Sequence, residues 1–113
     1  MDGARLTAVA VRSETRIVEP GALVSLHGRL DVVAAADARL ALADAVDAGT
    51  GELVLDLAGL ESVDATGLGV LLGAHRRAQR AGRSVVLRSV PDRVGRLLLI
   101  TRLDRVLRTT APV

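Results

Sequence analysis

The chain has 113 residues and a mass of 11.8 kDa, which is enough for one domain, residues 1–113, and too little for two. Half of it is apolar and aliphatic, and it has no aromatic residue and no cysteine, which excludes disulfides, thiol catalysis and cysteine-ligated metals. The net charge is only +2 and no aromatic residue is available for stacking, so direct nucleic-acid binding is not expected. The sequence shows no signal peptide and no apolar run of transmembrane length, which predicts a cytoplasmic protein without membrane insertion.

Alternating residues predict a strand over 6–12, and residues 15–18 either continue it or begin another strand. Glu19-Pro20-Gly21 has the composition of a turn. The nearly continuous apolar run that follows predicts a buried strand over 22–27, ended by the Gly28–Asp31 segment, which leads into a loop.

Alternating helices and strands are expected in the rest of the chain. In order they are a helix over 34–48, a strand over 52–58, a loop over 59–64, a helix over 66–81, a strand over 84–89, a helix starting at Pro91, and a short strand or helix end within 103–108. This order predicts a small α/β domain with a mixed sheet of four or five strands and with helices packed mainly on one face. Its central strand, 52–58, is expected to lead directly to the helix that carries Thr66.

Spacing within the helices predicts which residues face inward. Three- and four-residue spacing predicts one inward face in each of the first two helices: Ala35, Ala38, Leu42 and Val46 in the first, and Leu68, Leu71, Leu72 and His75 in the second. Gly49 suits the left-handed position after the first helix, and Gly82 ends the second. Gly69 and Gly73 lie four apart and would let another backbone or a partner approach closely.

An arginine cluster and two histidines are further candidates for a binding site. Arginines 76, 77, 80 and 83 are expected to be solvated near a helix C-terminus, with docking of an acidic or nucleotide-bearing partner as the alternative. His27 and His75 lie far apart in the sequence, so no histidine metal site is expected, and His75 is expected to be a half-buried edge residue.

The stretch Asp64-Ala65-Thr66-Gly67-Leu68-Gly69 joins the expected central strand to the second helix. Either Asp64 or Thr66 can cap this helix by accepting a hydrogen bond from its first turn. The helix N-terminus also favours a negative group, so a phosphate on Thr66 would find backbone donors there.

This junction resembles that of the STAS domain, most closely the single-domain anti-sigma factor antagonists of bacteria, which carry Asp-Ser-Ser-Gly-Leu-Gly. Gly28-Arg29-Leu30-Asp31 matches the family's Gly-x-Leu-Asp, and Val94-Gly95-Arg96-Leu97 extends the resemblance, which is clearest over 22–107. Thr66 occupies the place of the serine that the family phosphorylates.

The resemblance implies a regulator that is not an enzyme. The unphosphorylated form would bind an anti-sigma factor with serine/threonine kinase activity and release a sigma factor. The kinase, with its own ATP and Mg²⁺, would phosphorylate Thr66, and a phosphatase would reverse this; the chain itself would need no cofactor or metal. The partner surface would comprise Asp31, Asp64, Thr66, Gly67, Leu68 and Gly69.

An alternative within the same resemblance is a STAS scaffold or adaptor of a stress-sensing or lipid-transport complex, without a phosphorylation switch. The chain also departs from the family pattern. Ala65 replaces the first serine, which leaves Thr66 as the acceptor. Arg102 stands where the family often has glycine: if that position needs a positive φ, the arginine is strained by about 1–2 kcal/mol, and otherwise the helix ends differently.

Overall fold

The computed structural model describes residues 13–110, so the strand expected over 6–12 lies outside the described part. The five strands form one sheet in the order β1-β2-β3-β4-β5, in which β1 and β2 are antiparallel and the other neighbours are parallel. The strands are β1 (Ser13–Glu19), β2 (Leu23–Leu30), β3 (Glu52–Val63), β4 (Ser84–Arg88) and β5 (Arg108–Thr110). The helical elements are α2 (Ala35–Asp47), α3 (Ala65–Arg80), α4 (Asp92–Thr101) and a 3-10 turn, η1 (Leu103–Arg105).

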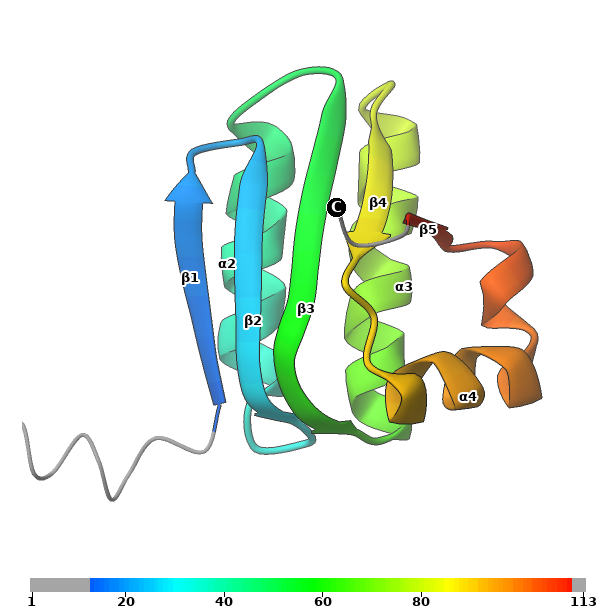
Figure 1. Ribbon diagram of the computed structural model, residues 1–113. Coiled ribbons are helices and arrows are strands. Elements are labelled where there is room, and N and C mark those ends of the chain that lie inside the picture. Colours follow the sequence, from blue (N-terminus) through cyan, green and yellow to red (C-terminus); the bar gives the residue numbers. More distant parts are fainter. Residues whose placement is uncertain (1–12, 111–113) are drawn as a thin grey trace, which may run out of the picture.

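One face of the sheet is covered by α2 and α3, which lie side by side, while α4 lies near the end of the sheet where α3 begins (Figure 1). Apolar residues alternate along the strands, as Leu53, Leu55 and Leu57 do in β3, and these side chains are buried against the helices. The expected mixed α/β sheet with helices on one face is confirmed.

The expected inward face of the first helix is confirmed, because Ala35, Ala38, Leu42 and Val46 are all buried. In the second helix Leu68 and Leu71 are buried, whereas Leu72 and His75 are only partly so. The buried face of α3 is completed by small or β-branched residues instead, namely Val70, Ala74 and Ala78.

The loop expected over 59–64 is wrong, because β3 continues to Val63 and pairs with β2 as far as Leu30. The register shifts between Ser25 and His27, where β3 carries one extra residue before Gly59. The strand ends expected at Gly28 and Gly59 are therefore wrong: both glycines lie inside strands, at or beside such irregularities, which is a common place for glycine in a sheet. Only Asp64 separates β3 from α3, as the expected direct connection requires.

The assignment of Gly49 to a left-handed position is also wrong, since the positive φ near this turn belongs to Gly51, at 75°. Gly49 is constrained by space instead. A Cβ there would lie 2.7 Å from the carbonyl oxygen of Gly21, closer than real Cβ atoms approach a neighbour. Gly82 follows the end of α3, as expected, and has a φ of 73°.

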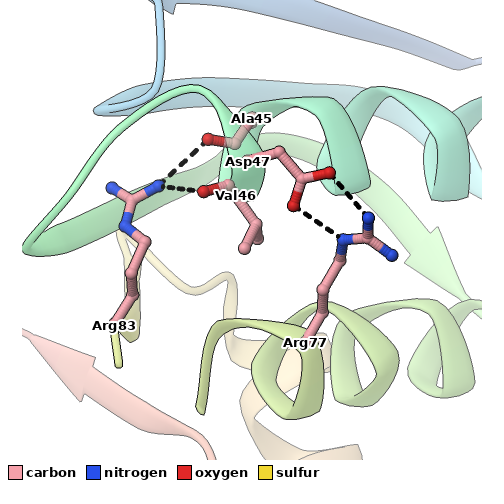
Figure 2. Close-up of polar contacts among 5 residues, drawn as sticks. All are labelled: Ala45, Val46, Asp47, Arg77 and Arg83. Carbon is pink, nitrogen blue, oxygen red and sulfur yellow. Dashed lines mark hydrogen bonds and ion pairs between the residues drawn. The ribbon is translucent and has the colours of Figure 1, made fainter. Parts of the chain in front are cut away.

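Arg83 is not solvated as expected, because only 6% of its surface is exposed. Its guanidinium donates to the last carbonyl oxygens of α2, at 3.0 Å from that of Ala45 and 2.8 Å from that of Val46 (Figure 2). It also donates to Gly21 in the β1–β2 turn at 2.5 Å. Arg77 of α3 reaches the same end of α2 by an exposed bidentate pair with Asp47, so this end of α2 is bound both by α3 and by the residue just before β4.

Candidate functional site

The candidate site lies where β2 and β3 both end and α3 begins. Leu30 and Val63 are paired at the ends of the two strands, and the backbone N–H of Asp64 donates to the carbonyl oxygen of Leu30 at 3.3 Å. Asp31 follows Leu30 directly and Asp64 follows Val63, so the parallel pairing brings both carboxylates to one edge of the sheet. The sequence predicts Asp31 at the end of a strand and Asp64 at the end of a loop, and it does not show that the two strands are neighbours.

Asp64 is the N-cap of α3. Its Oδ1 accepts a hydrogen bond of 2.8 Å from the backbone N–H of Gly67. Thr66 is therefore the second residue of the helix, half-buried, and not the cap. Because the cap occupies the Gly67 donor, the N–H groups of Ala65 and Thr66 remain at the open end of the helix, where the dipole is positive.

Gly67 determines how closely α3 approaches β2. A Cβ at this position would lie far below 3.0 Å from the carbonyl oxygen of Leu30 and 2.9 Å from Cγ1 of Val63. Only glycine allows this contact, and the contact sets the first turn of α3 beside the segment that begins at Asp31. Thr66 and Asp31 therefore belong to the same end of the molecule.

Asp31 organises the segment between β2 and α2. Its Oδ1 accepts from the backbone N–H groups of Val33 and Ala34, each at 3.1 Å. This holds Val32 and Val33 in a tight turn with their side chains 67% and 65% exposed. These two valines are not among the residues predicted for partner binding. The sequence pattern that could have revealed them is an apolar pair directly after a turn-forming aspartate, outside any predicted strand or helix.

The six residues predicted for partner binding differ in accessibility. Asp64 and Gly69 are exposed, and Asp31 and Thr66 are half-buried. Gly67 and Leu68 are buried, and Leu68 belongs to the hydrophobic core, so its side chain supports the site from below. Apart from the backbone of α3 itself and the adjoining residues, no described atom lies within 4 Å of a Cβ built at Gly69 or Gly73, so both glycines face open space.

No group of three or more potential ligands for a metal ion occurs among residues 13–110. A Ser25–His27 pair lies on the helix-free face of the sheet, with the serine Oγ 2.7 Å from Nε2. The carboxylate of neighbouring Asp56 is engaged by Arg88 at 2.9 Å and by the N–H of Ala58 at 3.0 Å. These residues therefore do not form a serine–histidine–aspartate relay. None of the described helices is long and apolar enough to cross a membrane.

Comparison with known proteins gives three independent similarities. A family model described as "Mlab, STAS domain" matches residues 13–109. The anti-sigma-B factor antagonist of Staphylococcus aureus is 30% identical over 80 residues, which are 71% of this chain and 74% of that protein. The structure of an anti-sigma factor antagonist from Mycobacterium paratuberculosis superposes with a TM-score of 0.71 at 26% identity, covering 86% of this chain and 84% of that one.

A STAS domain protein from Planctomyces limnophilus shares the fold with a TM-score of 0.73 at 16% identity, covering 88% of this chain and 90% of that one. The family model spans nearly all of the described sheet and helices, and the Staphylococcus relative covers most of both chains. The chain therefore belongs to the STAS domain family, in which it is similar to the anti-sigma factor antagonists.

Proposed function

We propose that the protein is an anti-sigma factor antagonist switched by phosphorylation of Thr66. The unphosphorylated form binds an anti-sigma factor that is also a serine/threonine kinase, and this releases a sigma factor. The kinase transfers a phosphate from its own ATP, held with Mg²⁺, to the Thr66 hydroxyl, and a phosphatase removes it. Thr66 is thus a substrate residue. The observation that carries the proposal is the shared surface formed by Asp31, Asp64 and Thr66 at the start of α3.

Local electrostatics support this switch. Phosphorylation adds about 1.5–2 negative charges to the end of α3 that already carries Asp31 and Asp64. The N–H groups of Ala65 and Thr66 stabilise a phosphate at the helix end, so the modified helix remains folded. A partner that accepts a mildly acidic surface would then meet a strongly acidic one. Repulsion and lost hydrogen bonds weaken the complex without a change of fold.

An apolar contact supports the same surface as a docking site. Val32 and Val33 are among the most exposed large apolar side chains of the described chain, and they follow Asp31 directly. Interfaces combine such an apolar centre with a polar rim. The valines supply the apolar part, and the two aspartates and the threonine hydroxyl supply polar groups around it.

The experiment is phosphorylation followed by mass spectrometry. The full chain is incubated with ATP, Mg²⁺ and each anti-sigma kinase that binds it, and Thr66→Ala is the matched control. One phosphate located on Thr66, absent from the control and accompanied by weaker kinase binding, supports the proposal. A bound kinase that leaves Thr66 unmodified refutes the switch. Concentrations are taken from peptide-bond absorbance, because the chain has no tryptophan or tyrosine.

A second candidate function is a STAS scaffold or adaptor without a switch, for example in a lipid-transport complex. The description of the matching family model, "Mlab, STAS domain", favours this candidate. The same surface would then be a constitutive docking site. Stable co-purification with a transporter ATPase, unaffected by Thr66→Glu, would favour this function over the switch.

A further inference from the structure

A cavity of about 470 Å³ lies beside the C-terminal half of α3, on a part of the molecule that the proposed switch does not use. His75 and Gln79 line it from α3, and Arg105 and Arg108 line it from η1 and β5. From Thr66 to His75 the helix advances about 14 Å, so the cavity is separate from the start of α3.

The cavity exists because β5 is short. β5 begins at Arg108, which pairs with Val86, so the first two residues of β4 have no strand partner on that side. These two residues, Ser84 and Val85, form the floor of the cavity. The chain between α4 and β5 passes the opening as η1 instead of filling it.

The lining is rich in donors, and none of its residues is acidic. Arg105 and Gln79 are exposed and make no side-chain hydrogen bond to another residue of the described range. Arg108 has one carboxylate neighbour, Glu52 at 3.6 Å, and both side chains are more than half exposed, so this pair is weak. The guanidinium of Arg105 is therefore available to a ligand.

The imidazole of His75 also lines the cavity. Its Nδ1 is buried and has no hydrogen-bond partner within the described structure. Such atoms are rare in folded proteins. Because Nδ1 is enclosed, Nε2 is the ring nitrogen that a molecule in the cavity can reach, and the fixed ring would hold it in place.

We propose that this cavity binds a small phosphorylated molecule. Its phosphate is held by Arg105 together with His75 and Gln79, because guanidinium, imidazole and amide N–H donors on several sides match the oxygens of a dianion. The volume exceeds that of inorganic phosphate and lies in the range of sites for small organic ligands. The half-exposed Val106 offers apolar surface to the rest of the molecule.

The test is a nuclear magnetic resonance titration of the full chain, labelled with nitrogen-15. Adenosine monophosphate, inorganic phosphate and adenosine are the three probes. We expect the monophosphate to shift the backbone signals of Gln79, Ser84 and Arg105, phosphate to shift the same signals more weakly, and adenosine to leave them in place. Equal shifts with adenosine, shifts confined to the first turn of α3, or no shifts at millimolar concentration would each overturn the proposal.

Two matched variants separate a built site from general attraction to a basic protein. Arg105→Gln and Arg93→Gln remove the same charge from exposed positions, and only Arg105 lines the cavity. The dissociation constant of the monophosphate should rise about tenfold in Arg105→Gln, the effect of losing a charged hydrogen bond, and stay within about twofold in Arg93→Gln. Equal weakening in both variants would show nonspecific attraction and refute the site.

Discussion

The backbone of Gly67 lies directly against the carbonyl oxygen of Leu30, and this contact joins the first turn of α3 to the end of β2. It places Thr66, the proposed phosphorylation site, at the same end of the molecule as Asp31, which is 35 positions earlier in the chain. The site therefore depends on a position that carries no reactive group.

Gly67→Ala should destabilise the protein by about 2–4 kcal/mol, because its Cβ meets backbone and α3 must move away from β2. Urea denaturation measures the loss. Gly69→Ala is the matched control: it lies in the same helix with open space around it, so it should stabilise by up to about 1 kcal/mol. Equal destabilisation by both substitutions would contradict the close contact.

Replacing Val32 and Val33 together by serine should weaken binding of the anti-sigma factor about tenfold and leave the free energy of unfolding within about 0.5 kcal/mol. Both side chains are exposed, so their loss removes contact area from the partner and little from the core. Calorimetric titration with the cognate anti-sigma factor measures the affinity. Leu40→Ser, an equally exposed position on α2, is the control and should bind normally.

Arg83→Lys should lower the free energy of unfolding by about 2–4 kcal/mol although it keeps the charge. A lysine ammonium cannot reach the separate carbonyl oxygens of Ala45, Val46 and Gly21 at once, and the unbonded carbonyls remain buried. Arg80→Lys, at an exposed position of α3, should change stability little. Similar urea midpoints for the two variants would show that the buried fork of hydrogen bonds contributes little.

Arg102→Gly should stabilise the protein by about 0.5–1 kcal/mol. Arg102 ends α4 with a φ of 63° in the left-handed region, and glycine removes that strain at some cost in chain entropy. Arg102→Ala keeps the strain and should give no gain. Thermal unfolding of the two variants, followed by circular dichroism, separates backbone strain from any effect of the side chain.

The pH dependence of stability should include a contribution from Asp56. Burial raises the pKa of this carboxyl, but the N–H of Ala58 and the guanidinium of Arg88 together outweigh it and hold the pKa below its ordinary value of 3.8. A carboxyl with a lowered folded-state pKa stabilises the protein above its unfolded-state pKa and loses that effect as the pH falls through the folded-state value.

Asp56→Asn should therefore destabilise the protein by about 1 kcal/mol at neutral pH. The difference from the parent chain should shrink as the pH falls below about 4 and disappear at still lower pH, where the parent carboxyl is protonated. Urea denaturation across this pH range gives the difference. A gap that stays constant down to the lowest pH would contradict the assigned ionisation.

Much of the fold could be predicted from sequence because apolar spacing and glycine chemistry are local. The first helix, expected over 34–48, is found at Ala35–Asp47, and Gly82 follows the end of α3, as expected. The extension of β3 to Val63 could not be predicted locally. Gly59 normally signals a turn, and only pairing with β2 keeps the strand extended there.

The sequence pattern indicates which residues belong to the candidate site, but it does not indicate how deeply each of them is buried. The junction residues Asp64 and Thr66 were identified from their pattern, and their helix position follows from the cap. The burial of Leu68 and the exposure of Val32 and Val33 depend on how the helix packs against the sheet. Arg83 was misread for the same reason, since its acceptors lie 31 to 62 positions earlier in the chain.

The arrangement around Arg83 has a consequence for the order of events during protein synthesis. The ribosome adds the last residues of α2 and the β1–β2 turn long before it adds Arg83. The side chain that donates hydrogen bonds to their carbonyl oxygens therefore becomes available only together with β4. A nascent chain that ends within α3 lacks this cation and also the β4 partner of the central strand. The first half of the molecule alone therefore lacks both the cation that satisfies the end of α2 and one neighbour of its central strand, and these contacts form only after β4 has been added.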